Sequence, residues 1–117
     1  MKITDIQALG ANLGGGNHIY VKVMTDEHLH GYGEAYRVGP DEAVAATVTY
    51  FKEWLIGEDP TRIEHLWRIM HNGSRFPGGS VINAAISGIE NALWDIKGKA
   101  HGVPVYQLLG GRCRDKI

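Results

Sequence analysis

Apolar and polar residues alternate along the first third of the chain, and this period of two predicts β-strands. The alternation covers residues 2–9 and, more clearly, residues 19–25, where Ile19, Val21 and Val23 share one face. Residues 26–29 can turn the chain into a third strand over residues 30–36. The three segments together predict an antiparallel meander, whose polar face needs another cover or solvent.

Beyond Val38 the apolar period changes to about 3.6 residues, which predicts helices. Residues 39–42 place a proline in the first helical turn and two carboxylates at the positive end of the helix dipole. This first helix is expected to run to Ile56 and to be ended by Gly57. Its predicted buried stripe is Val44, Val48, Phe51 and Leu55.

Two further long helices and a short one are predicted after Gly57. Asp59 is the expected N-cap of the second helix, which Asn72-Gly73 ends, and Ser80 is the expected N-cap of the third, which Gly102 ends. Pro104 opens a short turn of helix through Leu108. The apolar positions of the two long helices are Ile63, Leu66, Trp67 and Met70, then Ile82, Ile86, Ile89, Leu93 and Ile96.

Strands first and helices afterwards indicate the α+β class, with the helices on one face of the meander. Gly88 lies inside the third predicted helix, where glycine costs roughly 1 kcal/mol relative to alanine. We therefore expect a close backbone contact at Gly88 that compensates for this cost.

Composition narrows the class of protein. A chain of 117 residues with 44% hydrophobic residues suits one domain over residues 1–117. The net charge is −1 and the 12 Lys and Arg residues are scattered, which argues against a nucleic-acid partner. No apolar run reaches the roughly 20 residues of a membrane span, and the start of the chain does not resemble a signal peptide. With Cys113 as its single cysteine, the chain is expected in the cytoplasm without a membrane partner.

Three motifs carry a resemblance to a known family. They are GYGEA at residues 31–35, GEDPTRIEHLW at residues 57–67 and GGSVINAAISGIENALWDIKGK at residues 78–99. With the order of elements, they make the chain similar to the N-terminal capping domain of the mandelate racemase and muconate lactonizing enzyme group of the enolase superfamily. Within that group it most resembles the acid-sugar dehydratases of the galactonate and mannonate type.

The resemblance implies a magnesium-dependent reaction. In the family, Mg²⁺ held by three carboxylates stabilises an enediolate that forms when a base abstracts the proton beside the substrate carboxylate. Those groups lie in a (β/α)₈ barrel of roughly 200 residues or more, for which a 117-residue chain has no room. We therefore assign no catalytic residue and no metal ligand here, and we expect the barrel domain to follow as the partner that binds magnesium.

A capping domain of this family contributes substrate choice through two loops that close over the barrel. The first loop is expected at residues 12–18, where three consecutive glycines give a lid its freedom, although a floppy hairpin connection is the alternative. The second is expected at residues 36–39. The candidate substrate-binding residues for a small acid sugar are His18, Tyr36 and Arg37 first, then Asn17 and Arg75, with Asn12 beside them.

Three other motifs are interpreted as structural and not as catalytic, metal-binding or phosphate-binding sites. Lys97 and Lys99 follow the helical pattern, so they are interpreted as a solvated face or a domain contact and not as a catalytic Lys-x-Lys pair on a strand. His28 and His30 lack further ligands at a suitable spacing for a metal. Residues 14–16 lack the ending of a phosphate-binding loop.

Two functions remain open. One is a capping domain within a longer homo-oligomeric dehydratase, which is favoured because Lys116-Ile117 resembles the entry to a further strand. The other is a stand-alone, non-catalytic binding or assembly module with the same fold. An isolated capping domain should expose the apolar surface that meets the barrel and should therefore associate.

Overall fold

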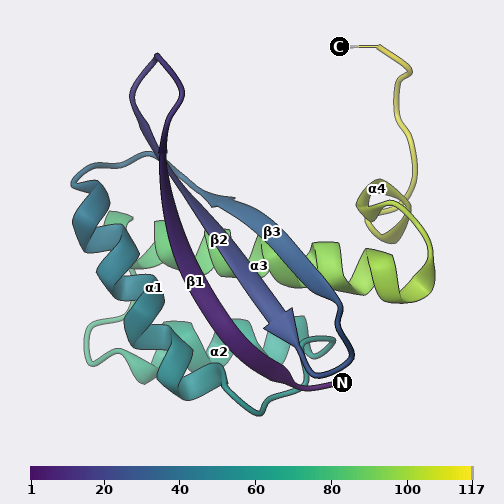
Figure 1. The fold of residues 1–117 in the computed structure, drawn as a ribbon, viewed down its shortest axis with the longest axis horizontal. Helices are drawn as coiled ribbons and strands as arrows, with labels where there is room; N and C mark the ends of the chain where they lie inside the picture. The colour runs from purple at the N-terminus through teal and green to yellow at the C-terminus, as the bar shows by residue number, and fades with distance from the viewer. Residues whose placement is uncertain (117) are drawn as a thin grey trace.

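Three antiparallel strands precede four helices in a computed structural model that describes residues 1–116 (Figure 1). The strands are β1 (Ile3–Asn12), β2 (Asn17–Thr25) and β3 (His30–Ala35), paired in the order β1-β2-β3. The helices are α1 (Asp41–Leu55), α2 (Ile63–Gly73), α3 (Ser80–His101) and α4 (Val105–Leu108). The predicted α+β class and order of elements are confirmed. Ile117, part of the predicted strand entry, lies outside the described residues.

Helices α1 and α3 cover one face of the sheet, and α2 packs against these two helices. Figure 1 shows the sheet in front, α3 crossing behind β2 and β3, and α1 beside β1. Residues alternate in burial along β2 and β3, with Val21 and Val23 fully buried on the helix side. On the opposite face Leu9 and Tyr32 keep 41% and 47% of their surface exposed. None of the helices described for residues 1–116 is both long and apolar enough to span a membrane.

A single apolar core joins the sheet to the helices. The predicted α1 stripe is buried in full, and Trp67 is the one predicted α2 position that stays half-buried. Ile82 is also half-buried, whereas the other four predicted positions of α3 are buried. The 3.6-residue period therefore identified the large side chains of the helical core but not the small buried residues Ala84, Ala85 and Ala92.

Helix α3 approaches the sheet closely because glycines face each other across the contact. A Cβ atom placed on Gly31 would lie 2.0 Å from the carbonyl oxygen of Ala92, and one on Gly33 would lie 2.1 Å from that of Gly88. A Cβ on Gly88 would lie 2.8 Å from a methyl group of Val21. The predicted close contact at Gly88 is confirmed, with Gly33 on the other side of it, and Gly31 allows the same close approach at Ala92.

The same helix covers part of the open edge of β3. The Tyr32 N–H donates to Oδ2 of Asp95 at 2.9 Å, and the Lys99 ammonium donates to that oxygen at 2.7 Å and to the His30 carbonyl at 2.8 Å. Lys99 thus lies on a helix and satisfies backbone groups of the edge strand. Lys97, two positions earlier on α3, lies instead over the ring of Trp94.

Several predicted boundaries were wrong. Asp59 does not cap α2, because its Oδ1 accepts hydrogen bonds from the N–H and hydroxyl of Thr61 in a turn that precedes the helix. Ser80 is the first residue of α3 and Gly79 is its N-cap, without a side-chain cap. Helix α1 ends one residue before Ile56, which is its C-cap.

The ion pair between Asp5 and Lys52 gives the fold a predictable response to acid. The Lys52 ammonium, and then the Gln7 amide, lower the pKa of the Asp5 carboxyl below its ordinary value of 3.8. Because the folded state binds this proton less tightly, the pair stabilises the fold fully above pH 3.8 and loses that contribution as the pH falls further.

We therefore expect Lys52→Met to lower the free energy of unfolding at neutral pH and to make little difference at low pH. Urea unfolding at a series of pH values measures this difference. Lys97→Met is the control, since its ammonium lies over Trp94 at 5.3 Å from the ring centroid. A Lys52 effect that does not change with pH would contradict the pairing.

Candidate functional site

The two segments expected to face a substrate come together at one end of the sheet. The β1–β2 loop, residues 13–16, projects beyond the strands, and the segment from β3 to α1 passes its base (Figure 1). Gly16 has a φ of +126°, and a Cβ atom placed on it would lie 2.0 Å from Nη2 of Arg37. The Arg37 guanidinium therefore rests on the backbone of the first loop.

The first loop is shorter than the predicted residues 12–18. Asn12 pairs with Asn17, and Ala11 pairs with His18, so the flanking polar residues belong to strands. The Asn12 side-chain oxygen accepts a hydrogen bond from the Gly14 N–H at 3.0 Å. The glycines thus form a tight hairpin tip, and the strand backbone fixes which way the side chains of the flanking candidate residues point.

His18 is held on the outer face of the sheet by a carboxylate that the sequence did not single out. Its Nδ1 lies 2.6 Å from Oε1 of Glu34 on the neighbouring strand, and its ring stacks on Tyr20 with an interplanar angle of 15°. Glu34 belongs to the GYGEA motif, whose alternation places it opposite the buried glycines. Finding it required the register between β2 and β3, because His18 meets it across strands.

Glu34 also lines an open hollow of about 420 Å³ beside Arg37. The lining residues are Glu34, Tyr36, Arg37, Ser87 and Asn91. Tyr36 is 73% exposed. Ser87 and Asn91, missed by the sequence analysis, lie four positions apart on α3, and that helical spacing was the available signal.

Arg37 offers a positive charge to this hollow. No ion pair of the structure over residues 1–116 engages its guanidinium. A guanidinium can donate two parallel hydrogen bonds to a carboxylate. The hollow thus combines one such donor with hydroxyl, amide and carboxylate groups.

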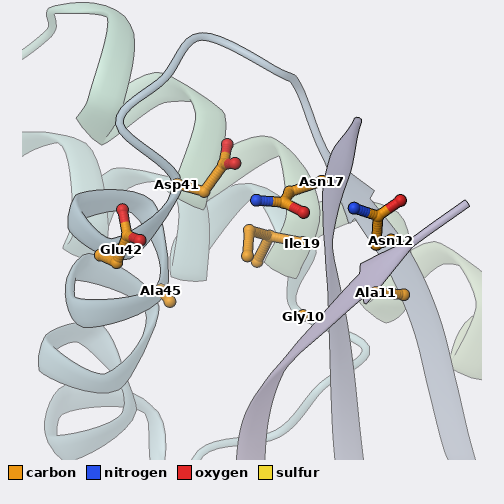
Figure 2. Close-up of a pocket in the computed structure, with 8 residues that line it drawn as sticks. All are labelled: Gly10, Ala11, Asn12, Asn17, Ile19, Asp41, Glu42 and Ala45. Carbon is orange, nitrogen blue, oxygen red and sulfur yellow. The ribbon is translucent and has the colours of Figure 1, made fainter. Parts of the chain in front are cut away.

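Asn17 lies in a different hollow, between the sheet and the start of α1. Figure 2 shows its amide directed toward α1, with the carboxylates of Asp41 and Glu42 on the far side. Because consecutive strand residues point to opposite faces, Asn17 and His18 are separated. The hollow measures about 360 Å³, and its two carboxylates would repel an acidic ligand.

Arg75 lies apart from both hollows. It belongs to the α2–α3 connection, and its guanidinium carbon lies 6.0 Å from the centroid of the Phe76 ring. The structure therefore places Tyr36 and Arg37 in one hollow, which Glu34 connects to His18, and leaves Asn17 and Arg75 elsewhere.

The described residues do not form the magnesium site that the resemblance implies. Across residues 1–116, His, Cys, Asp and Glu side chains nowhere gather in a group of three or more that could hold a metal. The carboxylates of Asp5, Asp95 and Asp115 each pair with a Lys or Arg instead. Magnesium prefers hard oxygen donors such as carboxylates, and these three carboxylates are already paired with cations.

Comparison with known proteins gives a consistent result. The family model described as mandelate racemase / muconate lactonizing enzyme, N-terminal domain, matches residues 11–110. A D-galactonate dehydratase of Variovorax paradoxus is 50% identical over 99 residues, which are 85% of this chain and 26% of that protein. A D-galactonate dehydratase of Xanthomonas campestris pv. campestris is 44% identical over the whole chain and 30% of its own length.

Solved structures of enolases are similar to this chain over nearly its whole length. An enolase from Pantoea ananatis with bound D-gluconate and Mg aligns with a TM-score of 0.94 and 43% identity, over 99% of this chain and 28% of that one. An enolase from Agrobacterium radiobacter with bound Na and L-malate aligns with a TM-score of 0.93 and 40% identity, over 100% and 30%. The chain thus spans less than a third of the length of these relatives. It belongs to the mandelate racemase / muconate lactonizing enzyme N-terminal domain family of the enolase superfamily.

Proposed function

We propose that this chain is the capping domain of a magnesium-dependent acid-sugar dehydratase and that it binds the substrate without performing the chemistry. The observation that carries the proposal is the contact of the Arg37 guanidinium with Gly16, which joins the two candidate loops beside a polar hollow. Relatives named D-galactonate dehydratase and a structural neighbour with bound D-gluconate and Mg support the substrate class.

An acid sugar presents one carboxylate and a row of hydroxyls, and the hollow offers a partner for each. Arg37 would donate to the carboxylate, while Tyr36, His18 and Glu34 would exchange hydrogen bonds with hydroxyls. The β1–β2 loop would close over the bound molecule and exclude water, for which Gly14, with a φ of +81°, supplies backbone freedom.

In this proposal the catalytic acid and base and the carboxylates that hold Mg²⁺ belong to a barrel domain of the longer protein. The ion supplies positive charge beside the substrate carboxylate when it is bound. The residues of this chain orient the substrate, so that the proton beside its carboxylate faces the base.

An activity comparison tests this division of labour. We would assay the 117-residue chain and the longer protein encoded by its reading frame against a panel of aldonic acids with Mg²⁺. Dehydration to a 2-keto-3-deoxy acid is expected from the longer protein only. Turnover by the short chain would contradict the placement of the catalytic groups. A longer protein that dehydrates no acid sugar would overturn the dehydratase and leave a binding or assembly module as the better account.

A further inference from the structure

We infer that Glu34 is a positioning residue that fixes the tautomer of His18, so that Nε2 of His18 accepts a hydrogen bond from a hydroxyl of the substrate. The inference rests on the proposed function for the identity of the substrate. The tautomer itself is a property of this chain and can be measured without any substrate.

The contact is built by the strand register. Ile19 pairs with Ala35, so His18 and Glu34 lie diagonally on the outer face of neighbouring strands. The distance of 2.6 Å between Nδ1 and Oε1 is short for such a pair, as expected when the acceptor is a carboxylate. Tyr20, which stacks on the imidazole, restricts the ring from a second direction. The His18 side chain is 21% exposed and that of Glu34 is 45% exposed, so both can reach a ligand.

The chemistry of the two groups decides the position of the proton. An ionised carboxylate can only accept hydrogen bonds, so Nδ1 must carry the proton that it donates to Glu34. A neutral imidazole has one N–H, and its other nitrogen is then an acceptor. The structure over residues 1–116 gives Nε2 of His18 no hydrogen-bond partner. It is therefore available to a hydroxyl donor, of which an acid sugar has several.

The second carboxylate oxygen connects this pair to the hollow. Glu34 lines the hollow with Tyr36 and Arg37, while its Oε1 is engaged by His18. Its Oε2 can accept from a second hydroxyl. Two acceptors side by side select for a pair of hydroxyls, whereas Arg37 selects for a carboxylate. A cross-strand pair with only a structural role would need neither a free Nε2 on His18 nor a free Oε2 on Glu34.

Nitrogen-15 NMR of the 117-residue chain at a pH where imidazoles are neutral tests the tautomer directly. We expect His18 to carry its proton on Nδ1 in the wild type. In Glu34→Ala the proton should shift toward Nε2, the form favoured by free histidine, and in Glu34→Gln the amide oxygen should retain most of the Nδ1–H form. Glu53→Ala, on the exposed face of α1, is the control and should change nothing. An Nε2–H tautomer of His18 in the wild type, or a His18 tautomer that does not change in Glu34→Ala, overturns the inference.

Kinetics of the longer protein test the link to substrate. Glu34→Ala should raise KM for an acid sugar about tenfold and leave kcat within about twofold, because it removes hydrogen bonds made equally in the ground and transition states. The effects of Glu34→Ala and His18→Ala should be less than additive, since both remove the acceptor at Nε2 of His18. Additive effects, or an unchanged KM, overturn the positioning role. A wild-type enzyme inactive on every acid sugar is a failure of the proposed function instead, and the NMR result then decides the inference.

Discussion

Gly33→Ala is expected to destabilise the protein by about 3 kcal/mol, the upper part of the usual range for overpacking. The added methyl group would lie 2.1 Å from the Gly88 carbonyl oxygen and 2.7 Å from the Ala92 nitrogen. Both are backbone atoms of α3, so no side-chain rotation relieves the clash, and the helix must move away from the sheet. Urea unfolding followed by circular dichroism measures the loss.

Gly15→Ala is the matched control for this substitution. A Cβ atom on Gly15 would meet nothing within 4 Å, and its φ lies outside the left-handed region. We expect its effect on the free energy of unfolding to stay within about 0.5 kcal/mol. Equal effects of the two substitutions would contradict the close approach of α3 to β3.

Arg37→Ala is expected to raise KM of the longer protein for an acid sugar by about 10- to 100-fold, the range for a lost charge-assisted hydrogen bond. Arg37→Lys should recover part of this loss, because it keeps the charge but not the planar fork. Gly16→Ala should also raise KM, but by less than Arg37→Ala. Its methyl group would lie 2.0 Å from Nη2 of Arg37 and displace the guanidinium. Steady-state kinetics with a panel of aldonic acids measure all three.

Arg68→Ala is the control for the loss of a surface arginine. Arg68 is exposed on α2, away from the residues that line the polar hollow. Its substitution should leave KM within about twofold. An unchanged KM in Arg37→Ala would show that the hollow beside Gly16 does not receive the substrate carboxylate.

The spacing of apolar residues predicted the architecture, because residues that share one face of a strand or helix are buried together. The alternation of Ile19, Val21 and Val23 and the helical spacing of Val44, Val48 and Phe51 each place apolar side chains on one face. The boundaries were harder. Asp59 has the side chain of an N-cap, but its Oδ1 accepts a hydrogen bond from the Thr61 N–H in the turn before the helix.

The site was only partly predictable for a related reason. Tyr36 and Arg37 could be proposed from their place after the third strand, and both line the hollow that Glu34 shares with them. Glu34 could not, because its contact with His18 depends on strand register, and the helical spacing of Ser87 and Asn91 did not by itself show that α3 brings them beside β3. The loop around Gly14 was predicted too long, since cross-strand pairing of Asn12 with Asn17 outweighs the poor strand propensity of asparagine.

A crystal structure of the longer protein with Mg²⁺ and an aldonic acid tests the central claim most directly. The account predicts that His18, Tyr36 and Arg37 lie within hydrogen-bonding distance of the ligand and that no side chain of residues 1–116 coordinates the metal. A ligand bound away from the hollow beside Arg37, or a carboxylate of this chain on the metal, would contradict it.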